Sequence, residues 1–179
     1  TTSPSMDILI SSNLERLLYS VSGSENVSAW MKQLSENGKY EVDASTLETI
    51  KGLFAAGCCD DDETKATISK IFKDKNYLCD THTAVAVKVY YDYKEKTGDA
   101  TPAVIASTAS PFKFSEAVLE AVEGKTDGLD EFEMVERLAA VTGKSCPEQL
   151  ANLRDKAVRF DGCCSKDSMD GVVFNMLGI

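Results

Sequence analysis

The sequence has no long apolar run and is short of positive charge. No stretch approaches the roughly 20 apolar residues that a helix needs to cross a bilayer. Lysine and arginine together number 19 against 29 aspartates and glutamates, which gives a formal net charge of −10. This surplus repels nucleic acid and anionic membranes, so we expect neither as a partner. The polar opening Thr1–Ser5 does not resemble a signal peptide, and we expect a cytoplasmic protein.

The six cysteines include no C-x-x-C pair. They stand as two adjacent pairs, Cys58–Cys59 and Cys163–Cys164, with Cys79 and Cys146 alone. Neighbouring side chains diverge, which disfavours the binding of one zinc ion by two adjacent thiols. We therefore expect buried, inert thiols and no metal site. A thiol-based redox or metal protein is the competing interpretation, and it depends on the cysteine pairs alone.

What the sequence does contain is a succession of amphipathic helices. Apolar spacing predicts helices over residues 7–19, 27–34, 43–54, 63–72, 82–96, from 115, 130–143, from 147, and 167–177. Their N-terminal caps are predicted at Asp43, Asp60 with Glu63, Thr81, and Asp130 with Glu133. The same chemistry explains the acidic run 60–63 without a metal ion. The last helix is expected to bury Val172, Val173 and Met176.

Two short segments are predicted to be strands. One covers residues 40–42, and the other, Pro102–Ala106, is continuous and apolar, as in a strand buried on both faces. A helix followed by a buried strand is an α/β pattern, so we expect a helix-rich α/β fold with few strands. The chain is predicted to form one compact unit, with the part after Gly128 as a helical appendage.

A hydroxyl-rich turn, Ser107-Thr108-Ala109-Ser110-Pro111, follows the second predicted strand. In open α/β sheets ligands bind outside the carboxyl ends of the strands, so these hydroxyls are placed to meet one. Ordinary turn and capping chemistry by serine and threonine is the alternative. His82 is the only histidine and a candidate acid or base, although at the first turn of a helix it can also serve only to orient that turn.

Three motifs, in this order, resemble the threonine synthase family. Residues 2–18 (TSPSMDILISSNLERLL) resemble a family segment in which a Met-Asp-Ile turn leads into Ser-Asn-x-Glu-Arg. Residues 80–86 (DTHTAVA) resemble an Asp-x-His-Thr-Ala-Val-Ala element, with Thr81 where proline is more usual. Residues 108–114 (TASPFKF) resemble the end of a family strand and the turn after it. The helices that follow fit the C-terminal end of such an enzyme less specifically.

The resemblance implies the C-terminal portion of a fold-type II enzyme, similar to the tryptophan synthase β subunit, that uses pyridoxal 5′-phosphate (PLP). Such an enzyme converts O-phospho-L-homoserine and water into L-threonine and phosphate. By motif position, Thr108 is the candidate hydroxyl partner of the PLP pyridine nitrogen and Ser107 is the second choice. The candidates for binding substrate are Ser110, Lys113, His82 and Arg16. Residues 1–128 would belong to the catalytic domain and 129–179 to a helical appendage.

The resemblance also implies parts that this sequence does not contain. The family carries its Schiff-base lysine in a Phe-Lys-Asp motif and binds the PLP phosphate with a glycine-rich loop. The one Phe-Lys-Asp here, Phe72–Asp74, follows the Met-Asp-Ile motif, whereas the cofactor lysine should precede it. We therefore expect a fragment that lacks the N-terminal portion, is inactive alone and self-associates through exposed apolar surface. A non-catalytic binding or structural module derived from the enzyme fold is the alternative.

Overall fold

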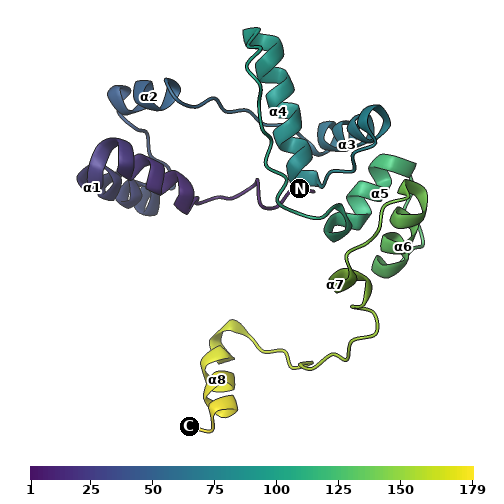
Figure 1. The fold of residues 1–179 in the computed structure, drawn as a ribbon. Coiled ribbons are helices and arrows are strands. Elements are labelled where there is room, and N and C mark those ends of the chain that lie inside the picture. Colours follow the sequence, from purple (N-terminus) through teal and green to yellow (C-terminus); the bar gives the residue numbers. More distant parts are fainter. The chain divides into compact units, whose positions relative to one another are not determined.

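The computed structural model describes all 179 residues and consists of helices and loops (Figure 1). In chain order the elements are α1 (Ser12–Asn37), α2 (Ala44–Lys51), α3 (Asp61–Lys75), α4 (Thr81–Thr97), η1 (Pro111–Phe114), α5 (Ser115–Glu123), α6 (Glu131–Thr142), α7 (Glu148–Ala151), η2 (Lys166–Ser168) and α8 (Met169–Leu177). They form two compact units, Thr1–Cys146 and Pro147–Ile179. None of the helices has both the length and the apolar character that spanning a bilayer requires.

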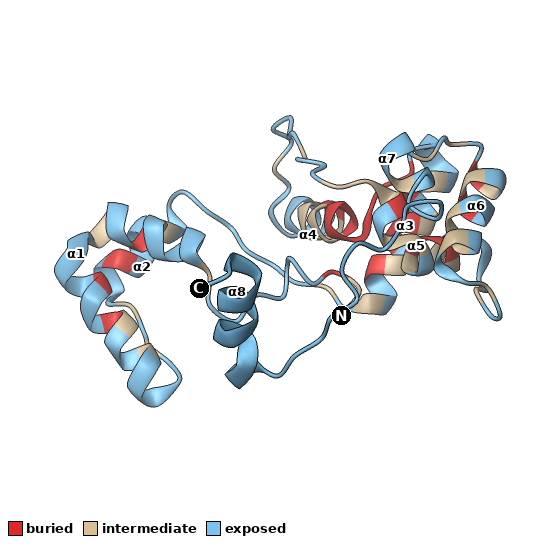
Figure 2. Ribbon diagram, turned by 90° about the horizontal axis from the view of Figure 1, so that it is seen from below, coloured by how far each residue is buried: buried red, intermediate tan, exposed pale blue.

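The main core of the first unit lies among α3, α4, α5 and α6. Helices α4 and α5 both pack on α3, and α6 packs on α5. The apolar residues that are 0% exposed here are Ile68 of α3, Ala84 of α4, Val118 and Leu119 of α5, and Leu138 of α6. Figure 2 shows buried positions in red on these helices. An ion pair of 2.7 Å between Lys65 of α3 and Glu120 of α5 lies at the edge of this packing.

Helices α1 and α2 pack on each other around a smaller core. Leu18, Val27 and Trp30 of α1 are buried there, and Ile50 of α2 packs against them. Tyr40 stacks on the Trp30 ring with 6.4 Å between ring centroids. Indole and phenol rings bury large apolar areas, so one pair can hold a short helix in place.

The start of the chain differs from the predicted pattern. Helix α1 begins at Ser12 and not at Asp7, because the Ser11 hydroxyl accepts the backbone N–H of Leu14 and caps the helix there. The two helices predicted over 7–19 and 27–34 form one element, interrupted at Gly23, where the backbone adopts φ 81° and ψ 175°. A side chain at that φ would be strained, so glycine permits the kink.

The other helix ends follow the capping signals closely. Asp43 caps α2, and capping boxes form at Asp60 with Glu63 and at Asp130 with Glu133. The exception is α4, whose cap is Asp80 and not the predicted Thr81. The Asp80 carboxylate reaches the backbone N–H groups of both His82 and Thr83, and a carboxylate is the stronger acceptor for a helix N-terminus.

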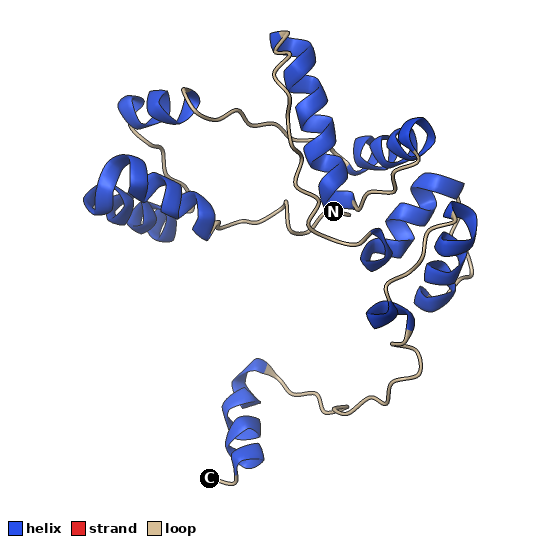
Figure 3. Ribbon diagram, viewed as in Figure 1, coloured by secondary structure: helices blue, strands red, loops and turns tan.

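Neither predicted strand is present, and the structure contains no β-strand (Figure 3). Residues 40–42 and 102–106 are loops without ladder partners. Val104, predicted to be buried on both faces, is 99% exposed. An extended segment becomes a strand only when a neighbouring strand supplies hydrogen bonds. The α/β expectation is therefore not confirmed for this chain, whereas its helix-rich character is.

The second unit consists of short helices with little burial. Helix α8 is present as predicted, but residues 151–179 are all exposed. The expected burial of Val172, Val173 and Met176 is therefore wrong for this chain. Helical spacing reports which side of a helix is apolar, and it does not report what covers that side.

No disulfide joins any of the six cysteines, and Cys79 is the one whose side chain is buried. Burial raises the pKa of the Cys79 thiol to about 11, and the nearby Asp80 carboxylate adds to that effect. Cys58, Cys163 and Cys164 are exposed, so the prediction of buried thiols holds only for Cys79. No group of three or more histidine, cysteine, aspartate or glutamate side chains is placed to hold a metal ion.

This difference in burial predicts selective alkylation. At pH 8 about one thousandth of Cys79 would be thiolate, the reactive form, and its side chain is also shielded from reagent. We expect iodoacetamide to modify Cys58 in the native chain while Cys79 reacts only after unfolding. Peptide mass spectrometry before and after adding urea measures both. Equal native rates at the two cysteines would contradict the burial of Cys79.

Candidate functional site

A largely apolar cavity of about 660 Å³ lies beside α4. Its lining combines the loop after α2, one side of α4 and the segment before Pro111, with Met6 from the start of the chain: Met6, Leu53, Ala55, Ala56, Ala86, Val89, Tyr90, Tyr93, Ala103, Val104, Ile105, Ala106 and Thr108. An apolar concavity with a few polar groups is the usual form of a small-molecule site. Thr108 is the only member of the hydroxyl-rich turn that reaches it.

The loop after α2 approaches α4 closely at Gly57. A Cβ atom at this position would lie 2.9 Å from Cγ1 of Val89, a cavity-lining residue. Valine is stiff at χ1, so it cannot turn away freely. Glycine at residue 57 thus allows the loop to form one wall of the cavity.

Gly57→Ala should therefore destabilise the chain by about 1–2 kcal/mol through overpacking. Gly52→Ala is the matched control, because a Cβ there would meet only ordinary contacts at 3.5 Å. Thermal unfolding followed by circular dichroism measures both. Equal melting temperatures for the two variants would show that the loop does not pack on Val89.

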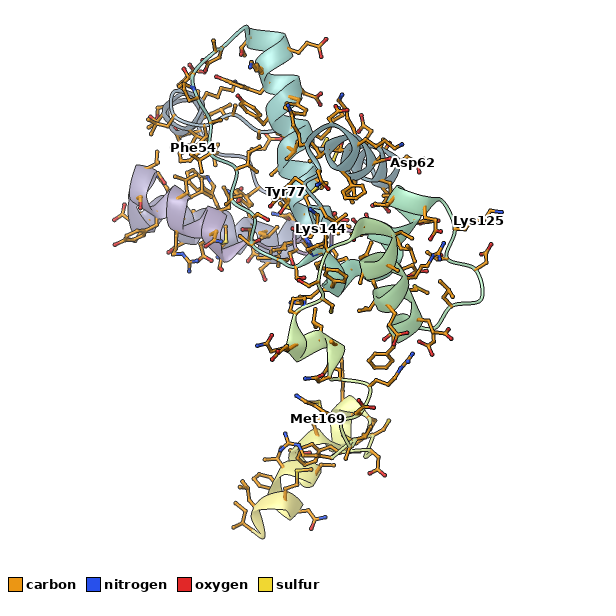
Figure 4. All side chains as sticks on the ribbon, turned by 45° about the vertical axis from the view of Figure 1, so that its right-hand side comes forward. Phe54, Asp62, Tyr77, Lys125, Lys144 and Met169 are labelled. Carbon is orange, nitrogen blue, oxygen red and sulfur yellow. The ribbon has the colours of Figure 1, made fainter.

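Ser107 lies at the centre of a chain of hydroxyl groups. The Tyr77 hydroxyl, labelled in Figure 4, donates to Ser107 Oγ over 3.1 Å. Thr83 Oγ1 is 3.2 Å from Ser107 Oγ and also bonds to Oδ2 of the buried Asp80. Thr83 has one hydroxyl hydrogen, and a carboxylate can only accept, so that hydrogen goes to Asp80. The Ser107 hydrogen then points to Thr83, and Ser107 has no hydrogen left for a ligand.

Thr108, one residue later, is in a different state. Its side chain is exposed, lines the cavity and makes no hydrogen bond within the chain. The structure therefore separates the two adjacent candidates, with Ser107 engaged internally and Thr108 available to a bound molecule.

His82 connects three segments that are distant in sequence. Its Nε2 accepts the backbone N–H of Ser5 over 3.0 Å, and its Nδ1 lies 3.2 Å from Asp80 Oδ1. The Phe114 ring packs at a tilt, with 4.6 Å between ring centroids. Ser5, His82 and Phe114 each belong to one of the three motifs that carry the family resemblance. The motifs thus meet in space at one buried ring.

The start of the chain is anchored at a second point. The backbone N–H and hydroxyl of Thr2 both donate to Asp61 Oδ1 over 2.9 Å. These bonds lower the pKa of Asp61, because they stabilise its ionised form. Met6, which lines the cavity, directly follows Ser5, the residue anchored at His82.

The remaining candidates lie away from the cavity lining. Ser110 caps η1 by accepting the backbone N–H of Phe112. Lys113 is exposed on η1, and Arg16 is exposed on α1, where it bonds to Asn13. The structure does not bring Ser110, Lys113 or Arg16 together with Thr108 at this site.

Several residues of the site were missed by sequence reasoning. Asp80 had a signal in the sequence, since aspartate directly before a helical segment is a preferred N-cap residue. Tyr90 and Tyr93 also had a signal in the sequence, because residues three apart lie on the same face of a helix. Tyr77 had none, because its bond to Ser107 joins residues 30 positions apart.

Comparison with known proteins agrees with the motifs. The family model for the C-terminal part of threonine synthase matches residues 83–170. Threonine synthase of Saccharomyces cerevisiae is 39% identical over 140 residues, which cover 69% of this chain and 27% of that protein. The chain thus spans about a quarter of that relative's length.

Solved structures agree in fold. The crystal structure of threonine synthase from yeast matches with a TM-score of 0.77 and 30% identity, covering 99% of this chain and 36% of that one. PLP-bound threonine synthase from Brucella melitensis matches with a TM-score of 0.68 and 35% identity, covering 88% of this chain and 30% of that one. The chain belongs to the threonine synthase family and corresponds to its C-terminal part.

Proposed function

We propose that this chain acts as the C-terminal part of an enzyme that converts O-phospho-L-homoserine and water into L-threonine and phosphate with PLP. Family membership supports the reaction, and a relative solved with PLP bound supports the cofactor. The observation that carries the proposal is the Thr108 hydroxyl, which is free of internal bonds and faces an apolar cavity.

Thr108 fits the role of partner to the PLP pyridine nitrogen. When bound, PLP supplies an electron sink for the carbon acids of the substrate. A neutral hydroxyl leaves the ring nitrogen largely unprotonated, in contrast to a carboxylate, and so moderates that sink. Ser107 is the weaker candidate, because its hydrogen is directed to Thr83. Tyr90 and Tyr93 also line the cavity and would contribute aromatic surface to it.

The rest of the site would come from the part of the enzyme that precedes this chain. The cofactor lysine and the loop for the PLP phosphate belong there by family pattern. In the complete enzyme, residues 102–106 would pair as a strand of an α/β sheet, which would cover Val104. The apolar surface that is exposed in this chain would pack against that portion, or against a second copy when it is absent.

Other parts of the proposal concern placement. Lys113 and Arg16 are exposed cations and remain proposed contacts to the substrate phosphate, with Ser110 as a neighbour. Residues 1–128 would belong to the catalytic domain and 129–179 to a helical appendage. We place the enzyme in the cytoplasm.

Phosphate release from O-phosphohomoserine by the complete enzyme carrying this segment tests the function. We expect Thr108→Val, which keeps the shape and removes the hydroxyl, to lower kcat by about 10²-fold. Thr108→Ser keeps the hydroxyl and should retain most of the rate. Equal rates for wild type and Thr108→Val would remove Thr108 from the site. A complete protein that releases no phosphate would favour the non-catalytic module.

A further inference from the structure

We propose that Asp80 and His82 are positioning residues that hold the two turns bordering the cavity, with His82 as a neutral ring protonated on Nδ1. The proposal replaces the acid, base or substrate-binding role considered for His82. It rests on the proposed function only for the location of the site.

The protonation of the ring follows from its neighbours. Ser5 presents a backbone N–H to Nε2 over 3.0 Å, and an amide N–H can only donate. Nε2 must therefore present its lone pair. The other nitrogen, Nδ1, lies 3.2 Å from the Asp80 carboxylate oxygen and 3.3 Å from the Thr81 hydroxyl oxygen. A neutral imidazole carries one hydrogen, so with Nε2 as acceptor that hydrogen is on Nδ1, where the carboxylate accepts it. In a doubly protonated ring, the Nε2 hydrogen would point at the hydrogen of the Ser5 N–H, and the two donors would repel each other.

Asp80 uses one oxygen for each turn. Its Oδ1 accepts from the His82 ring, which in turn accepts from Ser5. Its Oδ2 accepts from the Thr83 hydroxyl, which receives the Ser107 hydrogen. Asp80 is 0% exposed, so no water competes for either oxygen.

Two series of hydrogen bonds start at Asp80: one runs through His82 to Ser5, and the other runs through Thr83 to Ser107. The residue that follows each end point lines the cavity. Ser5 precedes Met6, and Ser107 precedes Thr108. One buried carboxylate is therefore connected to two segments that contribute to the lining. His82 Nε2 is occupied by Ser5 and is not free to take a proton from a substrate.

The tautomer can be measured directly, because His82 is the only histidine in the chain. Long-range ¹H–¹⁵N spectra of the chain labelled with ¹⁵N-histidine should show one imidazole, protonated on Nδ1 and not on Nε2, at pH 7.5. Asp80→Asn should shift the ring nitrogen signals. Asp43→Asn, which alters the cap of α2, should leave them unchanged. If the labelled chain is helical and its His82 ring carries the hydrogen on Nε2, the proposal is wrong.

A second test uses the complete enzyme and decides the matter if the labelled chain is not helical. His82→Gln keeps an acceptor for the Ser5 N–H, whereas His82→Leu does not. We expect the glutamine variant to keep roughly tenfold more kcat/KM than the leucine variant, which is the effect of about one hydrogen bond. The pH–rate profile of the glutamine variant should have the same acidic and basic limbs as that of the wild-type enzyme.

Two other outcomes are informative. Equal losses in both variants, with one limb of the pH profile missing, would show that His82 itself transfers a proton and would overturn the positioning role. A wild-type complete enzyme without phosphate release would refute the proposed function, and the tautomer measurement would still decide the state of His82.

Discussion

Asp80→Ala should lower the free energy of unfolding of this chain by about 3–5 kcal/mol. The carboxylate accepts hydrogen bonds from the backbone of His82 and Thr83, from the Thr83 hydroxyl and from the His82 ring. Because the site is fully buried, water cannot replace the lost oxygens, and several donors are left unpaired. Urea unfolding followed by circular dichroism at 222 nm measures the loss.

Asp43→Ala provides the matched control. Asp43 also caps a helix and accepts bonds from the backbone and hydroxyl of Thr46, but its own side chain faces solvent. A hydrogen bond from the Ser45 hydroxyl, together with these two from Thr46, lowers the pKa of Asp43 to about 2. Because Asp43 is exposed, water can occupy the place that its carboxylate leaves, so its loss should be clearly smaller. Equal losses for both aspartates would mean that the burial of Asp80 does not matter.

The helices were predictable because their determinants are local. Asp60 with Glu63 and Asp130 with Glu133 are visible as pairs three residues apart, and each forms the expected capping box. The cap of α4 was predicted one residue late, because both Asp80 and Thr81 have suitable side chains. The choice between adjacent caps depends on which oxygen reaches the N–H groups, and spacing alone does not report that.

The strand over residues 102–106 was not predictable in the same way. Its apolar run is real, but strand formation requires a partner from elsewhere in sequence. Val104 is exposed in this chain for that reason. The same limit applies to α8, whose apolar residues are present without a surface that covers them.

The residues of the site remain a prediction. Motif position indicated Thr108 as the first candidate hydroxyl and Ser107 as the second. Their division of roles depends on Tyr77 and Thr83, which lie 30 and 24 residues from Ser107 in sequence. These contacts join segments that are distant in sequence, so the spacing of residues within the turn does not report them.

Leu119→Ala should destabilise the chain by about 2–5 kcal/mol, the usual effect of removing a buried leucine side chain. Leu119 is 0% exposed and lies in α5, which packs on both α3 and α6. The cavity left behind would border several helices at once, so local collapse cannot fill it. Urea unfolding of the chain measures the loss, and a change below about 1 kcal/mol would contradict a shared core.

Leu53→Ala is the comparison that connects this core to the complete enzyme. Leu53 is 74% exposed and lines the candidate cavity, so in this chain its truncation should change stability by less than about 0.5 kcal/mol. If the rest of the enzyme covers the cavity wall, as the proposed function requires, the same truncation in the complete enzyme should cost about 1–3 kcal/mol. Leu119→Ala should cost the same in both, because its partners are already in this chain. A small effect of Leu53→Ala in both proteins would place the covering portion elsewhere.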